Sequence, residues 1–265
     1  MINSVNSVGS SALNFVQWPP VGDLDELAKA RTEATNLVQW LARIANSYVT
    51  EGPPERRTEL EFRASAATLF TKPFDKNLAL EIRLPNLEMQ FIDNGNPVPH
   101  ILDPEEHSPA EIEAWILVEL LHRGLDREKF SKKLSYTVPG LMSGDAEDHS
   151  PQSCQQGLTQ LVAWFQSAAA VLGAASRIAD PANIRIVCLP QTLNLTCILG
   201  EGAIQADFGF SPGDTQNPEP FFYAQSSAVI GPAGANSRSI LKASKLLAER
   251  DPAAAVLKFL MPITG

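Results

Sequence analysis

The chain has 265 residues, 44% of them hydrophobic and 19% charged, and a globular chain of this length buries roughly 70 to 75% of its unfolded surface. Its 21 basic and 30 acidic residues give a net charge of −9 without long runs of one sign, which opposes binding to nucleic acid and to anionic lipid. With no run of about 20 apolar residues for a bilayer span, we expect a soluble protein with neither partner.

The amino terminus and the cysteines indicate the compartment. Residues 1–12 are polar, lack basic residues and contain no apolar segment of the signal-peptide kind. We expect these residues to form a disordered tail and the protein to be cytoplasmic. The three cysteines, Cys154, Cys188 and Cys197, match no CxxC spacing, which predicts buried, reduced thiols.

The first third of the chain predicts one helix followed by a meander of strands. From Asp23 to about Tyr48, apolar residues recur at steps of three and four, which is typical of an amphipathic helix that ends before Gly52-Pro-Pro54. Alternating apolar and polar residues then predict strands, and Asn94-Gly95-Asn96 predicts a hairpin turn. The expected strands contain Leu60 and Phe62, Leu78 to Leu84, Leu87 to Phe91, and Pro97 to Leu102.

A capped helix opens the middle of the chain. Ser108 supplies a hydroxyl cap, Pro109 needs no amide partner in the first turn, and Glu111 can bond back to the cap, so a helix is predicted from here to about His122, before Gly124. A strand is expected near residues 133–138, and a polar loop follows over residues 139–152.

The last part of the chain predicts a helix, then three strands and two closing helices. A long amphipathic helix runs through residues 158–172, and strands are expected at 184–188, 193–199 and 204–210, with closing helices at 239–250 and 252–260. The pattern predicts an α+β fold, with largely antiparallel sheets covered by long amphipathic helices. We expect a single domain over residues 13–265. Because the strands fall into two blocks, this domain could be built of two similar halves.

Several segments carry a resemblance to a known family. In chain order they are residues 72–84, 87–95, the capped helix at Ser108, 144–149, 210–213, 218–223 and 251–260. Over most of the chain this order resembles domain of unknown function 5996, an uncharacterised bacterial family. That family carries histidines in or beside the two strands before the aromatic segment, whereas residues 184–199 and 203–210 contain none. The resemblance therefore implies no activity for this chain.

The aromatic segment from Phe208 to Tyr223 is the first candidate site. It places five aromatic residues among prolines, glycines and carboxylates without a regular period, which indicates a shaped loop. We predict a small-molecule pocket walled by four of the rings, with Asp207 or Arg63 orienting a polar ligand. The rings are Phe210, Phe221, Phe222 and Tyr223. The alternative is that they seal the end of the core and that Tyr223 bonds a polar partner.

The acidic loop is the second candidate. Asp145, Glu147, Asp148 and His149 lie within five residues, which suits a hard or borderline divalent metal or a carboxylate-oriented imidazole base, although the spacing matches no established metal loop. The alternative function is therefore an enzyme of the hydrolase or isomerase type that uses His149 with a nearby carboxylate, Asp148 or Asp207 being the candidates. A solvated loop that caps the following helix explains the same residues without a function.

The remaining candidates are weaker. A second cluster has donor atoms for a metal and consists of His100, Asp103, Glu105, Glu106 and His107. However, Asp103-Pro104 and Ser108-Pro109 are typical of a turn and of a helix cap. We therefore predict no metal site, and the sequence indicates no cofactor. A third possible function is a non-catalytic subunit that presents an apolar patch to another chain.

Overall fold

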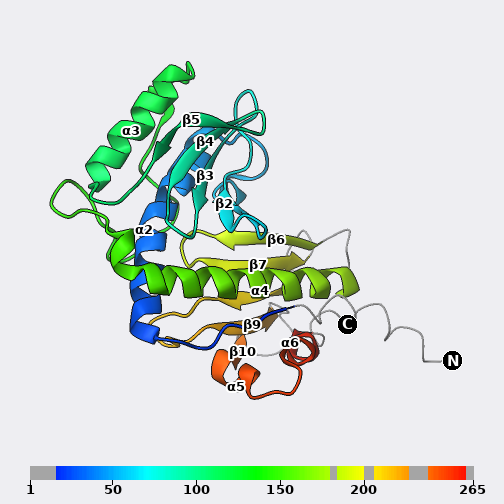
Figure 1. The fold of residues 1–265 in the computed structure, drawn as a ribbon. Coiled ribbons are helices and arrows are strands. Elements are labelled where there is room, and N and C mark those ends of the chain that lie inside the picture. The colour runs from blue at the N-terminus through cyan, green and yellow to red at the C-terminus, as the bar shows by residue number, and fades with distance from the viewer. Residues whose placement is uncertain (1–15, 180–183, 200–205, 227–237, 261–265) are drawn as a thin grey trace. The chain divides into compact units, whose positions relative to one another are not determined.

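The structure is a computed structural model that describes residues 16–179, 184–199, 206–226 and 238–260 (Figure 1). The predicted tail at residues 1–12 lies outside this range. The chain divides into two compact units: unit 1 comprises Met1–Leu24, Ala163–Val187 and Asn194–Gly265, and unit 2 comprises Asp25–Val162 and Cys188–Leu193. The single domain over residues 13–265 stays a prediction.

Unit 2 contains a five-stranded antiparallel sheet in which strands that are consecutive along the chain lie next to each other. Its strands are β1 (Glu61–Arg63), β2 (Thr68–Phe70), β3 (Leu78–Arg83), β4 (Met89–Asp93) and β5 (Asn96–Leu102). The predicted hairpin turn is confirmed, because Asn94 and Gly95 have φ angles of 48° and 80° between β4 and β5. Strand β2 was not predicted, since three residues are too few to establish an alternation.

Two long helices belong to unit 2, and both agree with their predicted bounds. They are α2 (Leu24–Tyr48) and α3 (Pro109–His122), and three short 3₁₀ turns accompany them, η1 (Pro54–Arg56), η2 (Arg127–Lys129) and η3 (Pro151–Cys154). The capping box of α3 is confirmed: Ser108 Oγ accepts the Glu111 N–H at 3.3 Å, and Glu111 Oε2 accepts the Ser108 N–H at 2.8 Å. Helix α3 lies beside β5 (Figure 1).

The strand expected near residues 133–138 is wrong, because this segment has no strand pairing. Its polar groups bond to side chains of α2 instead. Asn46 Nδ2 donates to the Lys133 carbonyl at 3.1 Å, and the Tyr136 hydroxyl donates to Gln39 Oε1 at 3.0 Å. The Asn46 amide thereby satisfies a backbone carbonyl that a neighbouring strand would otherwise have to pair.

Unit 1 carries the second five-stranded sheet, in the order β10-β9-β8-β7-β6. The strands are β6 (Ile184–Leu189), β7 (Asn194–Leu199), β8 (Ala206–Ser211), β9 (Phe221–Ser226) and β10 (Arg238–Lys242), and the helices α5 (Ala243–Leu247) and α6 (Pro252–Leu260) follow. The long helix α4 (Gln155–Ala179) contributes residues to both units. Two antiparallel sheets with long helices confirm the α+β class, and the two sheets are consistent with two similar halves.

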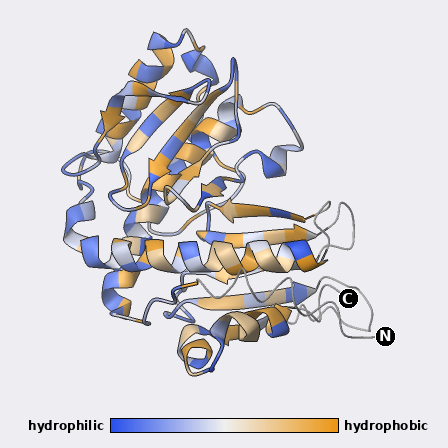
Figure 2. Ribbon diagram, turned by 45° about the vertical axis from the view of Figure 1, so that its right-hand side comes forward, coloured by the Kyte–Doolittle hydropathy of each residue, from blue (hydrophilic) through white to orange (hydrophobic). Residues whose placement is uncertain are grey.

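Hydropathy follows these elements. The strands carry long hydrophobic stretches, whereas the loops are mainly hydrophilic (Figure 2). Among the described residues, the segment Pro151–Ile178 is long and apolar enough to cross a membrane by length and composition, and 56% of its most apolar window is buried inside the protein. The core helix of a soluble protein has the same properties. The absence of a membrane partner stays a prediction.

A glycine permits close contact between α2 and α4. A Cβ built on Gly157 would lie 2.1 Å from the backbone oxygen of Glu26 and 2.9 Å from the Cβ of Ala30. Both distances are shorter than atoms can approach, and backbone cannot move aside as a flexible side chain can. The first turns of α4 therefore lie against α2 only because residue 157 has no side chain.

We predict that Gly157→Ala destabilises the protein by about 1 to 3 kcal/mol, because the extra methyl group overpacks this contact. Gly173→Ala is the matched control in the same helix, since its nearest atom would be Arg177 Nη1 at 3.7 Å. Replacing that helical glycine should leave stability unchanged or raise it by about 0.5 to 1 kcal/mol. Urea unfolding of both variants measures the difference, and equal effects would contradict the prediction.

Candidate functional site

His149 lies at the end of the acidic loop, two residues before η3 begins at Pro151, and its side chain is only 1% exposed. Its Nδ1 atom is 2.8 Å from Oε2 of Glu33 on helix α2. The backbone of His149 is also held, because its N–H donates to the His107 carbonyl and its carbonyl accepts the Glu106 N–H, both at 3.0 Å. The ring therefore has a defined orientation toward Glu33.

Glu33 is an ionised acceptor for two groups. Besides His149, it accepts the Ser150 N–H on Oε1 at 2.9 Å. Burial, the largest single influence, raises the pKa of Glu33, but the two hydrogen bonds and the charge of His149 together lower its pKa below the ordinary value of 4.5. An ionised carboxylate only accepts, so His149 Nδ1 carries the shared proton, and Nε2 is the ring nitrogen that remains for proton transfer.

A second carboxylate holds the residues that follow. Glu105 accepts the Ser150 hydroxyl on Oε1 at 3.2 Å and the Gln152 N–H on Oε2 at 2.9 Å. It thereby caps the start of η3, where backbone N–H groups have no partner within the turn. Glu33 and Glu105 together fix residues 149–152 to the rest of unit 2.

The structure changes the predicted partner of His149. Asp145, Glu147 and Asp148 are all exposed, and the carboxylate that meets the ring is Glu33, 116 residues away in sequence. Sequence reasoning missed Glu33. Its spacing was the available signal, because it lies three residues after Ala30 and four before Leu37 on the buried stripe of α2.

The Glu33 carboxylate should make stability depend on pH. Its folded-state pKa is lowered, so its stabilisation is complete above the unfolded value of 4.5 and is lost as pH falls through the folded value. We predict that Glu33→Gln lowers the free energy of unfolding at neutral pH by about 1 to 3 kcal/mol. The difference from the unmodified protein should shrink as pH falls below 4.5.

Thermal melts between about pH 7 and about pH 3.5 measure this dependence. Asp148→Asn is the control, since Asp148 is an exposed neighbour of the same ring residue, and it should show little effect at any pH. A melting-temperature difference for Glu33→Gln that stays constant over this range would contradict the assignment.

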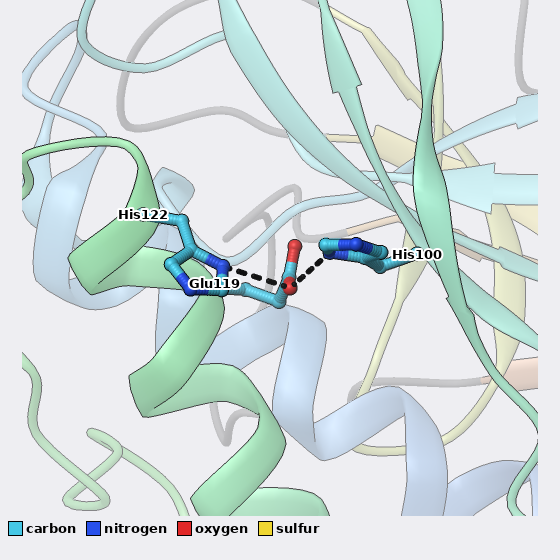
Figure 3. A group of neighbouring side chains, drawn as sticks. All are labelled: His100, Glu119 and His122. Atoms are coloured by element: carbon cyan, nitrogen blue, oxygen red, sulfur yellow. Dashed lines mark hydrogen bonds and ion pairs between the residues drawn. The ribbon is translucent and has the colours of Figure 1, made fainter.

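The predicted cluster around His100 does not converge on one point. Asp103 accepts the Glu105 N–H at 3.0 Å, and His107 Nδ1 bonds the Glu105 carbonyl at 2.8 Å, as turn residues do. His100 instead meets helix α3, where its Nδ1 lies 3.0 Å from Oε1 of Glu119. His122 Nδ1 lies 3.6 Å from the same oxygen (Figure 3). These three side chains are the group among the described residues that could hold a metal ion.

All five aromatic residues of the segment lie in strands, which corrects the prediction that they form a loop. Phe208 to Ser211 belong to β8, and Phe221 to Tyr223 belong to β9, so only residues 212–220 connect them. Phe210 pairs with Phe222 across the two strands. Pairing between the strands imposes a period of two that prolines and glycines in the connection obscured.

The rings of this segment pack against one another and against α4. Phe210 stacks on Trp164 with 6.1 Å between ring centroids, and it meets Phe165 at 5.9 Å and Phe222 at 5.4 Å. Phe210 and Phe222 are buried. These contacts are those of a core, as the alternative interpretation expected, and the ligand pocket stays a prediction.

Tyr223 lies on the opposite face of the sheet from Phe222, its neighbour on β9. The Tyr223 hydroxyl bonds Thr196 Oγ1 at 2.6 Å, so the expectation that a buried tyrosine finds a polar partner is confirmed. Its ring covers Gly209, where an added Cβ would lie 2.7 Å from the hydroxyl oxygen. Phe221 is buried beside it, with Arg238 5.2 Å from the ring centroid.

Asp207 and Arg63 were the predicted polar partners of these rings. The side chain of Asp207 is outside the described residues, although its backbone pairs with Ile198 and Gln225 in the sheet. Arg63 is exposed on β1 of unit 2, with its guanidinium 4.9 Å from the ring centroid of Phe70. A joint role of these two residues stays a prediction.

We predict that Phe210→Ala lowers the free energy of unfolding by about 3 to 5 kcal/mol, because it removes a ring that packs against three others. Ile240→Ala on β10 is the control, since this side chain is 38% exposed and should cost far less. Chemical denaturation measures both. If Phe210→Ala were as mild as the control, the rings would be lining a space instead of filling the core.

The three thiols are buried and free, as predicted. Burial raises the pKa of Cys154 to about 11, and burial also raises the pKa values of Cys188 and Cys197. Because the thiolate is the reactive form, these cysteines are poor nucleophiles in this environment.

No protein-family model, curated protein or solved structure matches the chain. The resemblance to domain of unknown function 5996 therefore stays a prediction, and so does a role as an interaction subunit. Any function has to be argued from the geometry of the described residues.

Proposed function

We propose that the protein is an enzyme of the hydrolase or isomerase type in which His149 acts as the general base and Glu33 orients it. The observation that carries this proposal is the 2.8 Å contact between His149 Nδ1 and Glu33 Oε2, made by a ring that is only 1% exposed. A general base of this kind needs a fixed tautomer and a carboxylate that stabilises the protonated ring. Glu33 meets both needs.

The proton transfer follows from this geometry. Nε2 of His149 takes a proton from water or from a substrate group, and the resulting imidazolium keeps its Nδ1–H bond to Glu33. The same nitrogen then returns the proton to the leaving or rearranged group. Because the ring is buried, the proposal requires the residues that cover Nε2 to move when a substrate binds.

A small molecule is the substrate class that the charge of the chain favours. The net charge of −9 opposes polyanionic partners such as nucleic acid and favours solubility. We also include a cytoplasmic location in the proposal, because residues 1–12 carry no signal-peptide pattern. The proposed site does not include the aromatic rings of unit 1, because Phe210 and Phe222 are buried and pack against each other as core side chains do.

The test compares His149→Gln, Glu33→Gln and Asp148→Asn with the unmodified protein on a panel of ester, phosphate and thioester substrates and on isomerisable hydroxy- and keto-acids. We expect His149→Gln to lower kcat by about 100- to 10 000-fold, the usual contribution of a general base. Glu33→Gln should also lower kcat, since the ring loses its ionised partner. Asp148→Asn should leave kcat unchanged.

Folding must be measured on the same variants, because both bonded residues also hold unit 2 together. Circular dichroism and thermal melts identify a variant that is folded at the assay temperature. Activity that survives His149→Gln in a folded variant would overturn the proposal. A loss of activity that follows only the loss of fold would assign Glu33 and His149 a structural role.

A further inference from the structure

Glu119 is a buried carboxylate that faces two exposed imidazoles. It lies on α3 three residues after Ile116, which is buried, and its own side chain is 2% exposed. His100 comes from β5 and His122 from the last residue of α3, and their side chains are 59% and 55% exposed. Figure 3 shows both rings directed at one carboxylate oxygen.

The two oxygens of Glu119 have different surroundings. Oε2 lies 2.7 Å from Nη1 of Arg123, which is itself fixed by donating to the Glu119 backbone carbonyl at 2.7 Å. The Arg123 guanidinium also lies 4.7 Å from the ring centroid of Phe91. Arg123 therefore holds the carboxylate from behind and leaves Oε1 for the imidazoles.

The separations suit a small cation. Metal-to-ligand distances of about 2.0 to 2.2 Å place neighbouring ligand atoms about 3.0 to 3.5 Å apart. Oε1 of Glu119 lies 3.0 Å from His100 Nδ1 and 3.6 Å from His122 Nδ1, and one donor atom from each of the three residues lies within 4.8 Å of the others. Small rotations of two exposed rings would complete the geometry.

We propose that His100, Glu119 and His122 bind one divalent first-row transition metal ion. Two imidazole nitrogens and one carboxylate oxygen form a ligand set that suits Zn²⁺ and Fe²⁺, and it does not suit Mg²⁺ or Ca²⁺, which prefer oxygen ligands. Three protein ligands leave positions for water or for a ligand molecule, so the ion would be accessible from solvent. This site is independent of His149 and Glu33.

The competing explanation is a set of hydrogen bonds. One protonated imidazole could satisfy Glu119 without a metal, and both explanations fit the same distances. They differ in what added metal does. A hydrogen-bonded set takes up no ion, whereas a ligand set binds one equivalent and releases protons from its histidines.

The experiment measures Zn²⁺ binding to the full chain, without a polyhistidine tag, by isothermal titration calorimetry, and Co²⁺ binding by visible absorption. We expect one Zn²⁺ per chain, with weaker binding in more acidic buffer because the imidazoles must be neutral. His100→Ala, His122→Ala and Glu119→Gln should each weaken binding by at least the roughly 10- to 100-fold that loss of an outer-shell partner costs.

His107→Ala is the matched control. Its ring is also in unit 2 and partly exposed, but it bonds a backbone carbonyl and lies outside the three-residue set, so binding should be unchanged. Because Glu119 is buried and Glu119→Gln can lower stability, the two exposed histidine variants decide the outcome. No uptake of either ion, or uptake that both His100→Ala and His122→Ala retain at full affinity, would overturn the proposal.

Discussion

Two helices of unit 2 each carry a glutamate on the stripe that otherwise holds buried apolar side chains, and the side chains of Glu119 and Glu33 are 2% and 16% exposed. Glu33 on α2 and Glu119 on α3 both follow a buried residue by one helical step. A carboxylate in such a place is costly unless charged or polar groups surround it. Each glutamate therefore draws a histidine from another segment, His149 in one case and His100 in the other. The positions of the loop that carries His149 and of strand β5, which carries His100, depend on that requirement.

Chemistry and packing are divided between the two units. All four histidines of the chain belong to unit 2, and so do the carboxylates that meet them. Unit 1 carries the packed rings of Trp164, Phe165, Phe210 and Phe222, which meet at Phe210. A large aromatic cluster stabilises a small sheet efficiently, because each ring removes much apolar surface from water. The proposals for function accordingly concern unit 2.

Local patterns account for the correct predictions. Helices α2 and α4 were predictable because their apolar residues recur every three or four positions, and α3 was predictable because its start carries a capping box and Gly124 follows its end. The turn at Asn94-Gly95 was predictable because only such residues accept positive φ readily. The strand expected near residues 133–138 failed, since Asn46 and Gln39 supply side-chain partners that a local pattern cannot reveal.

By itself, the sequence determined the α+β class, the long helices and the capping box at Ser108, and it indicated His149 as a candidate site residue. These features depend on neighbours within a few residues, which the order of the chain displays directly. Only the tertiary structure decided that Glu33 is the partner of His149 and that Glu119 meets His100 and His122. It also decided that Phe221 to Tyr223 belong to a strand paired with the predicted strand that carries Phe208 and Phe210. Such contacts join residues far apart in sequence, and their geometry arises only when helices and strands pack.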